Sequence, residues 1–341
     1  MGEPRTKASL RDVANLAGVS IKTVSNVVNG YAHVSDATRF RVQEALDLLH
    51  YRPNLSARSL RGGRTGLIAL AVPELDSPYF AELARHVVRA AEERGWTVLI
   101  DQTDGMPERE QIVLAGIRAH LIDGVIFSPL ASGAAELTAR RDTTPMVLLG
   151  ERVSEGPADH VAIDNVAASQ AAVEHLVRLG RVRIGAVGEQ RRRSAGTARL
   201  RSRGYAAALR AGGLAPDHDL VRATDGYHRA DGAAAMTELL ALSRPPDAVF
   251  CYNDLMALGA LRTLHERGVR VPDDIALMGF DDIEESRYST PTLSTVRPDK
   301  AAIARAAIDL LARRLDVGTA EPPRRVRVPF TVVPRQTTVK D

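Results

Sequence analysis

Cysteine and lysine are scarce in this chain of 341 residues, and each scarcity limits what the chain can be. The single cysteine, Cys251, excludes an internal disulfide framework and agrees with a reducing compartment. Its apolar neighbours in AVFCY predict that the thiol is buried and inert. Lysine supplies only 4 of the 45 basic residues, so arginine is the default cation and a run of arginines carries little information here.

Long apolar runs are also missing. No stretch approaches the roughly 18 uncharged residues of a membrane span. The opening MGEPRTKASLRD lacks the apolar segment of a secretory signal. We therefore expect a cytoplasmic protein that does not associate with membranes.

The motifs of several large enzyme classes are absent too. There is no Walker A loop, no G-x-S-x-G turn, no H-E-x-x-H pair and no Cys/His spacing typical of a metal site. The nine histidines are scattered, and none has another at i+4. These absences argue against an enzyme, with no catalytic residue, cofactor or metal expected. An enzyme that uses carboxylates for acid–base work stays as an alternative.

The charge is unevenly distributed along the chain, whose length suits two or three domains. Residues 1–64 hold ten Lys/Arg against five Asp/Glu, a net charge of +5, so the remainder carries −2 of the total of +3. A small basic head on a slightly acidic body indicates that the head meets a polyanion.

The basic N-terminal segment reads as three short helices. Ser9 and Asp12 match a capping box at the start of the first helix, and Gly18 suits its left-handed end. Ser20 and Ser35 stand where they can cap the second and third helices. Two helices joined by a turn of about three residues, then a supporting helix, are typical of a helix-turn-helix DNA-binding domain. A small helical bundle of another purpose is the alternative.

The second helix presents candidate base-reading residues. Ile21, Lys22 and Asn26 are predicted on the face opposite its valines, near the N-terminal end where a recognition helix meets base edges. Lys22 can donate to guanine, Asn26 can pair with adenine, and Ile21 can pack on a thymine methyl. Short donors suited to phosphates surround them: Ser20, Thr23, Ser25, Asn29, Ser35, Thr38 and Tyr51.

The segment SLRDVANLAGVSIKTVSNVVNG, followed by VSDATRFRVQEALDLLHYRPNLSARSLRGGRTGLIAL, resembles the head of the lactose-repressor/purine-repressor (LacI/GalR) family of transcriptional regulators. The resemblance is dense over roughly the first 70 residues and continues in blocks to the C-terminus. AGVS, TVS, VVNG, LHYRPN and ARSL are specific together at these spacings. Operator DNA is the partner that the resemblance implies.

The resemblance also implies a hinge helix that orders on DNA and lies in the minor groove. Its matching residues are Asn54, Ala57, Arg58, Leu60 and Arg61. Leu60 matches a leucine that wedges between central base pairs, and the two arginines approach flanking phosphates. Without the resemblance, 53–65 reads as a linker bounded by proline and glycine.

From residue 66 the chain alternates strand and helix patterns, which predicts parallel sheets covered by helices on both faces. Strands are expected at 66–72, 96–101, 124–128, 146–150, 183–187, 248–252 and 275–280. The resemblance implies a two-lobed α/β fold similar to periplasmic sugar-binding proteins (type I). The expected domains are a helix-turn-helix head at 1–52, a hinge at 53–65 and an effector domain at 66–341. Within the last, lobe one is expected at about 66–165 plus 298–325, and lobe two in the remainder.

Polar and aromatic residues follow several of these strands, where open α/β sheets bind ligands. Asp76, Ser128 and Glu151 stand there, although some such residues, including Asn253, also fit helix N-caps. The resemblance assigns effector contacts to Arg201, Asn253, Asp281, Tyr79, Phe80 and Tyr227. The segment EQRRRSAG after Gly188 is hard to align, and its arginines are expected in a solvated loop.

The resulting hypothesis is a repressor of a carbohydrate-utilisation operon, whose affinity for a near-palindromic operator is controlled by a small molecule, with a sugar inducer favoured. The resemblance implies a homodimer. The C-terminal RRVRVPFTVVPRQTTVKD has no heptad helix for a tetramer. A periplasmic binding protein is the second alternative, against which the basic head argues. The identity of the effector, and whether it induces or corepresses, stay open.

Overall fold

The computed structural model describes residues 8–28, 31, 33–51, 64–116, 121–150, 153, 156–190, 196–317 and 321–339. The chain divides into two compact units, the head (Met1–Thr65) and the body (Gly66–Asp341). The described part of the head holds three helices: α1 (Leu10–Ala17), α2 (Ile21–Val28) and α3 (Asp36–Leu48). Val13, Val24 and Val42 form the fully buried centre between them.

Local hydrogen bonds explain where these helices begin. The backbone N–H of Ser9 donates to the Asp12 carboxylate at 2.7 Å, and the N–H of Asp12 donates back to Ser9 Oγ at 3.3 Å. Gly18 ends α1 with a φ of +64°. Ser20 and Ser35 each accept from the N–H three residues on, at 3.1 and 3.4 Å. The predicted capping box and caps are therefore confirmed.

The body contains two six-stranded sheets. Lobe one is built on the sheet ordered β11-β5-β4-β3-β1-β2. Its elements are β1 (Leu67–Val72), α5 (Pro78–Glu92), β2 (Thr97–Gln102), α6 (Pro107–Leu114), β3 (Gly124–Phe127), α7 (Ala134–Thr138), β4 (Met146–Leu149), β5 (Asp159–Ala162), α13 (Lys300–Val317) and β11 (Arg325–Arg327). The inner strands β1, β3, β4 and β5 are buried, whereas the edge strand β2 is largely exposed.

Lobe two is built on the sheet ordered β12-β10-β9-β8-β6-β7. Its elements are α8 (Asn165–Arg178), β6 (Ile184–Glu189), α9 (Gly196–Ala211), η1 (His218–Leu220), β7 (Val221–Ala223), α10 (Arg229–Leu240), β8 (Ala248–Cys251), α11 (Asp254–Glu266), β9 (Ala276–Phe280), α12 (Glu285–Tyr288), β10 (Ser294–Pro298) and β12 (Phe330–Val333). All pairings in both sheets are parallel except that of β10 with β12.

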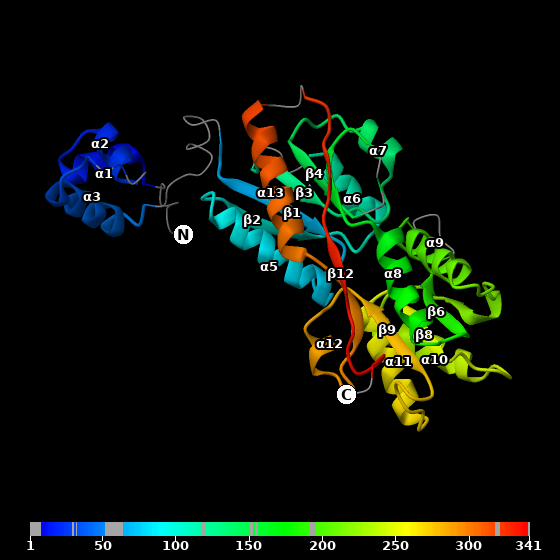
Figure 1. The fold of residues 1–341 in the computed structure, drawn as a ribbon. Helices are drawn as coiled ribbons and strands as arrows, with labels where there is room; N and C mark the ends of the chain where they lie inside the picture. Colours follow the sequence, from blue (N-terminus) through cyan, green and yellow to red (C-terminus); the bar gives the residue numbers. More distant parts are fainter. Residues whose placement is uncertain are drawn as a thin grey trace, which may run out of the picture. The chain divides into compact units, whose positions relative to one another are not determined.

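The chain passes between the lobes after β5, after β10 and after β11. Figure 1 shows α13 returning to lie beside α5, and the red C-terminal segment running from lobe one into lobe two. All seven predicted strands are present, and the two-sheet α/β class is confirmed. Strands β5, β7 and β10 were not predicted, because they are short or interrupted by charged residues. Strands β11 and β12 lie in the C-terminal segment RRVRVPFTVVPRQTTVKD, whose pattern is that of a strand and a tail. Lobe one's sheet also extends to Arg327, slightly beyond the expected 325.

Candidate functional site

Residues at the carboxyl ends of strands from the two lobes meet in one cross-lobe cluster. His228 Nε2 of lobe two lies 3.5 Å from the Glu74 carboxylate of lobe one. The N–H of Glu284, in lobe two, donates to the Glu82 carboxylate on α5 at 2.9 Å. Of the effector contacts expected from lobe two, Tyr227, Asn253 and Asp281 follow β7, β8 and β9, whose carboxyl ends share one edge of the sheet, whereas Arg201 lies on α9.

Arg201, on α9, is the most firmly held charge of the cluster. Its Nε donates to Asn165 Oδ1 at 2.8 Å, and a terminal nitrogen donates to the carbonyl of Tyr252. The guanidinium carbon lies 3.6 Å from the centroid of the Phe280 ring. Its other terminal nitrogen is 3.8 Å from Asp281 Oδ1. The side chain is therefore buried in one orientation, with its charge directed toward the Asp281 carboxylate.

Asp281 and Asp282 form a turn that directly follows β9. Their φ angles are +115° and +47°, in a region that residues other than glycine rarely adopt. The N–H of Asp281 donates to the carbonyl of Val296 at 2.8 Å. Lys300 Nζ donates to both turn carbonyls, at 2.7 Å for Asp281 and 3.1 Å for Asp282. These bonds from β10 and α13 fix the turn in its uncommon conformation.

The Asp282 carboxylate holds this turn in place through hydrogen bonds from three arginines. It accepts from Arg335 and Arg297 at 2.5 Å each, and from Arg287 at 3.2 Å. Burial acts to raise the pKa of Asp282, but the hydrogen bonds from Arg335 and Arg297 hold that pKa below its ordinary value. Asp282 is thus a structural anion, distinct in role from the neighbouring Asp281.

Asn253 is the N-cap of α11. Its Oδ1 accepts from the N–H of Met256 at 2.9 Å, and its Nδ2 donates to the carbonyl of Tyr227 at 2.8 Å. The cap that the sequence left open as an alternative is therefore present. The next residue, Asp254, is buried and accepts from Thr295 Oγ1 at 2.6 Å. Burial raises the pKa of Asp254 above its ordinary value.

Lobe one contributes aromatic rings and carboxylates. Tyr79 and Phe80, in the first turn of α5, are half-buried and make an edge-to-face contact with centroids 5.2 Å apart. Burial raises the pKa of Glu74, and the nearby carboxylates of Asp76 and Asp104 act in the same direction. Asp76 is itself exposed. The Glu74 carboxylate on this side of the cluster faces His228 of lobe two.

The predicted effector residues differ in the contacts that they make within the cluster. Arg201 approaches Asp281, Asn253 contacts Tyr227, and Tyr79 lies 5.7 Å from Lys300 Nζ by its ring centroid. Ser128 is buried at the end of β3, where its N–H donates to the carbonyl of Ala71 at 2.9 Å. Glu151 lies outside the described residues.

Sequence reasoning missed five side chains of the cluster: Glu74, Glu82, Asn165, His228 and Lys300. Lys300 left one signal in the sequence, because it is one of four lysines in a chain that otherwise uses arginine. Asn165 and Glu82 fit ordinary positions in helical segments, so their partners could not be read from the sequence.

In the head, Lys22 is exposed on α2 and Asn26 is partly exposed. Ile21 is half-buried and packs against the head core. Its predicted place opposite the valines was wrong, because it precedes Val24 by three residues and so shares that side of the helix. Only part of the Ile21 side chain is available to a base.

Several of the expected phosphate donors make hydrogen bonds or packing contacts within the head itself. Ser20 Oγ and Thr23 Oγ1 are 2.8 Å apart, and Ser35 Oγ donates to Thr38 Oγ1 at 3.0 Å. Tyr51 is half-buried against the head core. Outside the described residues lie Asn29 and the hinge residues Asn54, Ala57, Arg58, Leu60 and Arg61.

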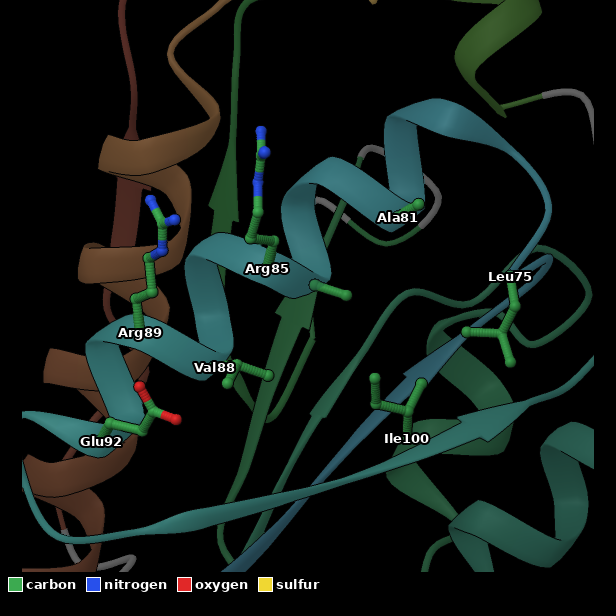
Figure 2. A pocket seen from close by; sticks show the side chains of 8 residues that line it. Leu75, Ala81, Arg85, Val88, Arg89, Glu92 and Ile100 are labelled. Carbon is green, nitrogen blue, oxygen red and sulfur yellow. The ribbon is translucent and has the colours of Figure 1, made fainter.

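A hollow on lobe one lies between α5 and the edge strand β2 (Figure 2). Val88 and Ile100 line it, and Arg85 and Arg89 extend from α5 beside them. Leu75 and Ile100 are 42% and 44% exposed, which is unusual for two large apolar side chains that lie close together. This apolar surface at an unpaired sheet edge is typical of a protein contact.

Within the described ranges, no helix is long and apolar enough to cross a membrane. No group of three or more His, Cys, Asp or Glu in those ranges could hold a metal ion. Cys251 is fully buried, as predicted, and burial raises the pKa of its thiol.

Comparisons with known proteins match part of each of the two units. Residues 9–54 match the model of bacterial regulatory proteins, lacI family, and residues 173–338 match that of the periplasmic binding protein-like domain. The chain is 33% identical to the ribose operon repressor of Escherichia coli K12 over 95% of this chain and 98% of that one.

Two solved structures are also similar. A complex of the transcriptional regulator CelR with cellobiose is 30% identical, with a TM-score of 0.72 over 97% of this chain and 99% of that one. The lac repressor dimer bound to operator and the anti-inducer ONPF is 28% identical, with a TM-score of 0.84 over 98% of this chain and 100% of that one.

Proposed function

Since the chain belongs to the lacI family of bacterial regulatory proteins, we propose that it represses a carbohydrate-utilisation operon and that a sugar controls its affinity for the operator. The head binds a near-palindromic operator, with Lys22, Asn26 and the accessible part of Ile21 at base edges. The protein acts in the cytoplasm, where its operator lies, and not as an enzyme.

The observation that carries the proposal is the buried pair of Arg201 and Asp281. A guanidinium fixed 3.8 Å from a carboxylate offers adjacent donors and acceptors to vicinal hydroxyls. The half-buried rings of Tyr79 and Phe80 offer an apolar surface suited to a sugar ring. A ribose operon repressor and a cellobiose-bound regulator among the similar proteins support this class of ligand.

Control follows from the position of the cluster between two lobes. A sugar that contacts Asp281 of lobe two and Tyr79 of lobe one favours one arrangement of the lobes over another. A changed arrangement acts on the hinge that precedes β1, and so on the operator. Linkage makes the effect reciprocal, because operator DNA must change sugar affinity by the same factor.

The proposed repressor is a homodimer. Each head reads one half of a two-fold operator. The hollow between α5 and β2, with its exposed Leu75 and Ile100, is the surface we assign to the contact (Figure 2). The lac repressor structure among the similar proteins is a dimer on operator.

A thermal-shift screen of sugars and nucleobases, followed by a mobility shift on the promoter of the protein's own transcription unit, tests the proposal. We expect a sugar to raise the melting temperature and to change operator affinity. Release of DNA identifies an inducer, and tighter binding a corepressor. Stabilisation by a nucleobase alone overturns the sugar assignment, and failure to bind any promoter fragment overturns the regulatory function.

A further inference from the structure

We propose that Glu82 and Lys300 are positioning residues of the effector site, which hold the Asp281 turn and transmit its occupancy to α5. This inference rests on the proposed function. Lys300 Nζ lies 2.6 Å from Glu82 Oε2, and both side chains are largely buried, with 8% and 18% exposed. The pair joins the first residue of α13 to the second turn of α5.

Lys300 has a second set of partners across the lobes. Its ammonium donates at 2.7 Å to the carbonyl of Asp281 and at 3.1 Å to that of Asp282. Three donor hydrogens are thereby matched to Glu82 and the two carbonyls, which satisfies the buried charge. Because the turn has positive φ at both residues, these bonds help to determine where the Asp281 carboxylate points.

Glu82 makes a cross-lobe contact of its own. Its Oε1 accepts from the N–H of Glu284 at 2.9 Å, while its Oε2 meets Lys300. The Glu82 carboxylate therefore holds the segment 281–284 directly at the N–H of Glu284 and, through Lys300, at the carbonyls of Asp281 and Asp282. Movement of that segment on ligand binding must displace Glu82 or break these bonds.

The helix that receives this contact also carries the proposed sugar-facing rings. Tyr79 and Phe80 lie one turn before Glu82, and the Tyr79 centroid is 5.7 Å from Lys300 Nζ. Arg85 and Val88, further along α5, line the hollow assigned to the dimer contact (Figure 2). A change at Asp281 thus has a direct, charge-based connection to the helix at the subunit surface.

A second ion pair that involves α13 supplies a control. Arg94, two residues beyond the end of α5, lies 2.6 Å from Asp309 of α13, and these side chains are 42% and 66% exposed. Glu82→Gln and Asp309→Asn each replace a carboxylate by its amide in an ion pair that involves α13. Only the first touches the cross-lobe cluster.

The experiment uses the full chain and measures two quantities. The first is the Kd for D-ribose by calorimetry, or for the best-stabilising sugar of the screen if that is another one. The second is the coupling factor, the ratio of operator Kd at saturating sugar to operator Kd without sugar. If a variant only binds the sugar more weakly, its coupling factor at saturating sugar equals that of the wild type. If a variant loses the connection between the effector site and α5, its coupling factor falls.

We expect Lys300→Met to weaken sugar binding at least tenfold and Glu82→Gln three- to tenfold, with a lower coupling factor in both. The double variant should resemble Lys300→Met alone, because the residues act as one unit. Asp309→Asn should stay within twofold of the wild type in both quantities. If Lys300→Met does not fold, as judged by its melting transition, Glu82→Gln decides the matter, since Gln keeps an acceptor for the N–H of Glu284.

The outcomes separate this inference from the proposed function. A wild-type chain that binds no sugar overturns both. A wild type that binds and responds, with Glu82→Gln unchanged in Kd and coupling factor, overturns only the positioning role. If Glu82→Gln binds sugar more weakly but keeps the coupling factor of the wild type, the pair only holds the site, and the proposed transmission to α5 is overturned.

Discussion

Arg314 of α13 donates two hydrogen bonds to Asp159 at the start of β5, from Nε at 2.7 Å and from a terminal nitrogen at 2.8 Å. Both side chains are buried. The carboxylate also accepts from the N–H of Arg324 at 2.6 Å, next to β11. One carboxylate therefore joins β5 to α13 and to the approach to β11, through partners 155 and 165 positions further along the chain.

Asp159→Asn should destabilise the body by about 3–5 kcal/mol, because it leaves the buried Arg314 charge without its partner. Denaturant unfolding of the body measures the loss. Glu266→Gln, in an exposed pair with Arg262, is the control and should cost less than about 1 kcal/mol. Equal effects of the two substitutions would contradict the structural role of Asp159.

The same carboxylate makes stability depend on pH. Burial acts to raise the pKa of Asp159, but hydrogen bonds from Arg314 and the Arg324 N–H hold it below its ordinary value. Its contribution is therefore complete above the ordinary pKa and is lost as pH falls below about 4. Unfolding followed from pH 6 to pH 3 should show this loss in the wild type and a weaker pH dependence in Asp159→Asn.

Lys22→Ala should relax base preference at one operator position, at a cost of about 1–3 kcal/mol there. The reason is the exposed ammonium near the start of α2. Binding to a set of operators with single base changes measures it. Arg58→Ala is the contrast, since loss of a phosphate contact should weaken all operators alike and reduce the salt dependence. An unchanged operator ranking for Lys22→Ala would show that the reading face is misplaced.

Asp281→Ala should abolish most sugar binding while leaving operator binding without sugar intact. Each sugar hydroxyl that loses its acceptor costs about 1–3 kcal/mol. If the sugar is an inducer, this variant stays on its operator at sugar concentrations that release the wild type. Calorimetry and mobility shifts measure both activities, and a parallel loss of the two would assign Asp281 to the fold.

Leu60→Ala tests the hinge that the resemblance implies, a segment outside the described residues. A leucine buried only between unstacked base pairs adds nothing to the free protein, so the melting temperature should not change. Operator affinity should fall by roughly 1.5–3 kcal/mol, the value of one buried leucine side chain. The DNA bend angle, measured by fluorescence energy transfer, should fall with it. Unchanged affinity and bending would make 53–65 a tether.

Patterns of residues that are close together in the sequence determined the helix caps and many of the strands of this protein. The capping box of Ser9 and Asp12 and the left-handed Gly18 depend on neighbours within a few residues, so they could be read directly. The seven strands predicted from apolar runs are equally local. The family blocks around Arg201 and Asp281 located the lobe-two half of the candidate site, because motif and position stay together along the chain.

Tertiary structure decided the rest, because the partners are far apart in sequence. Glu82 meets the N–H of Glu284 across 202 positions, and Asp159 meets Arg314 across 155. Periodicity carries no information on which charge meets which over such separations. Short strands such as β5 and β10 likewise exist because a neighbouring strand offers its edge, and their own sequences, DHVA and STVRP, are too short and polar to predict them. The sequence therefore determined most of the elements and several lobe-two residues of the site, and the contacts of Glu82 and Lys300 with the segment 281–284 decided how the two lobes meet there.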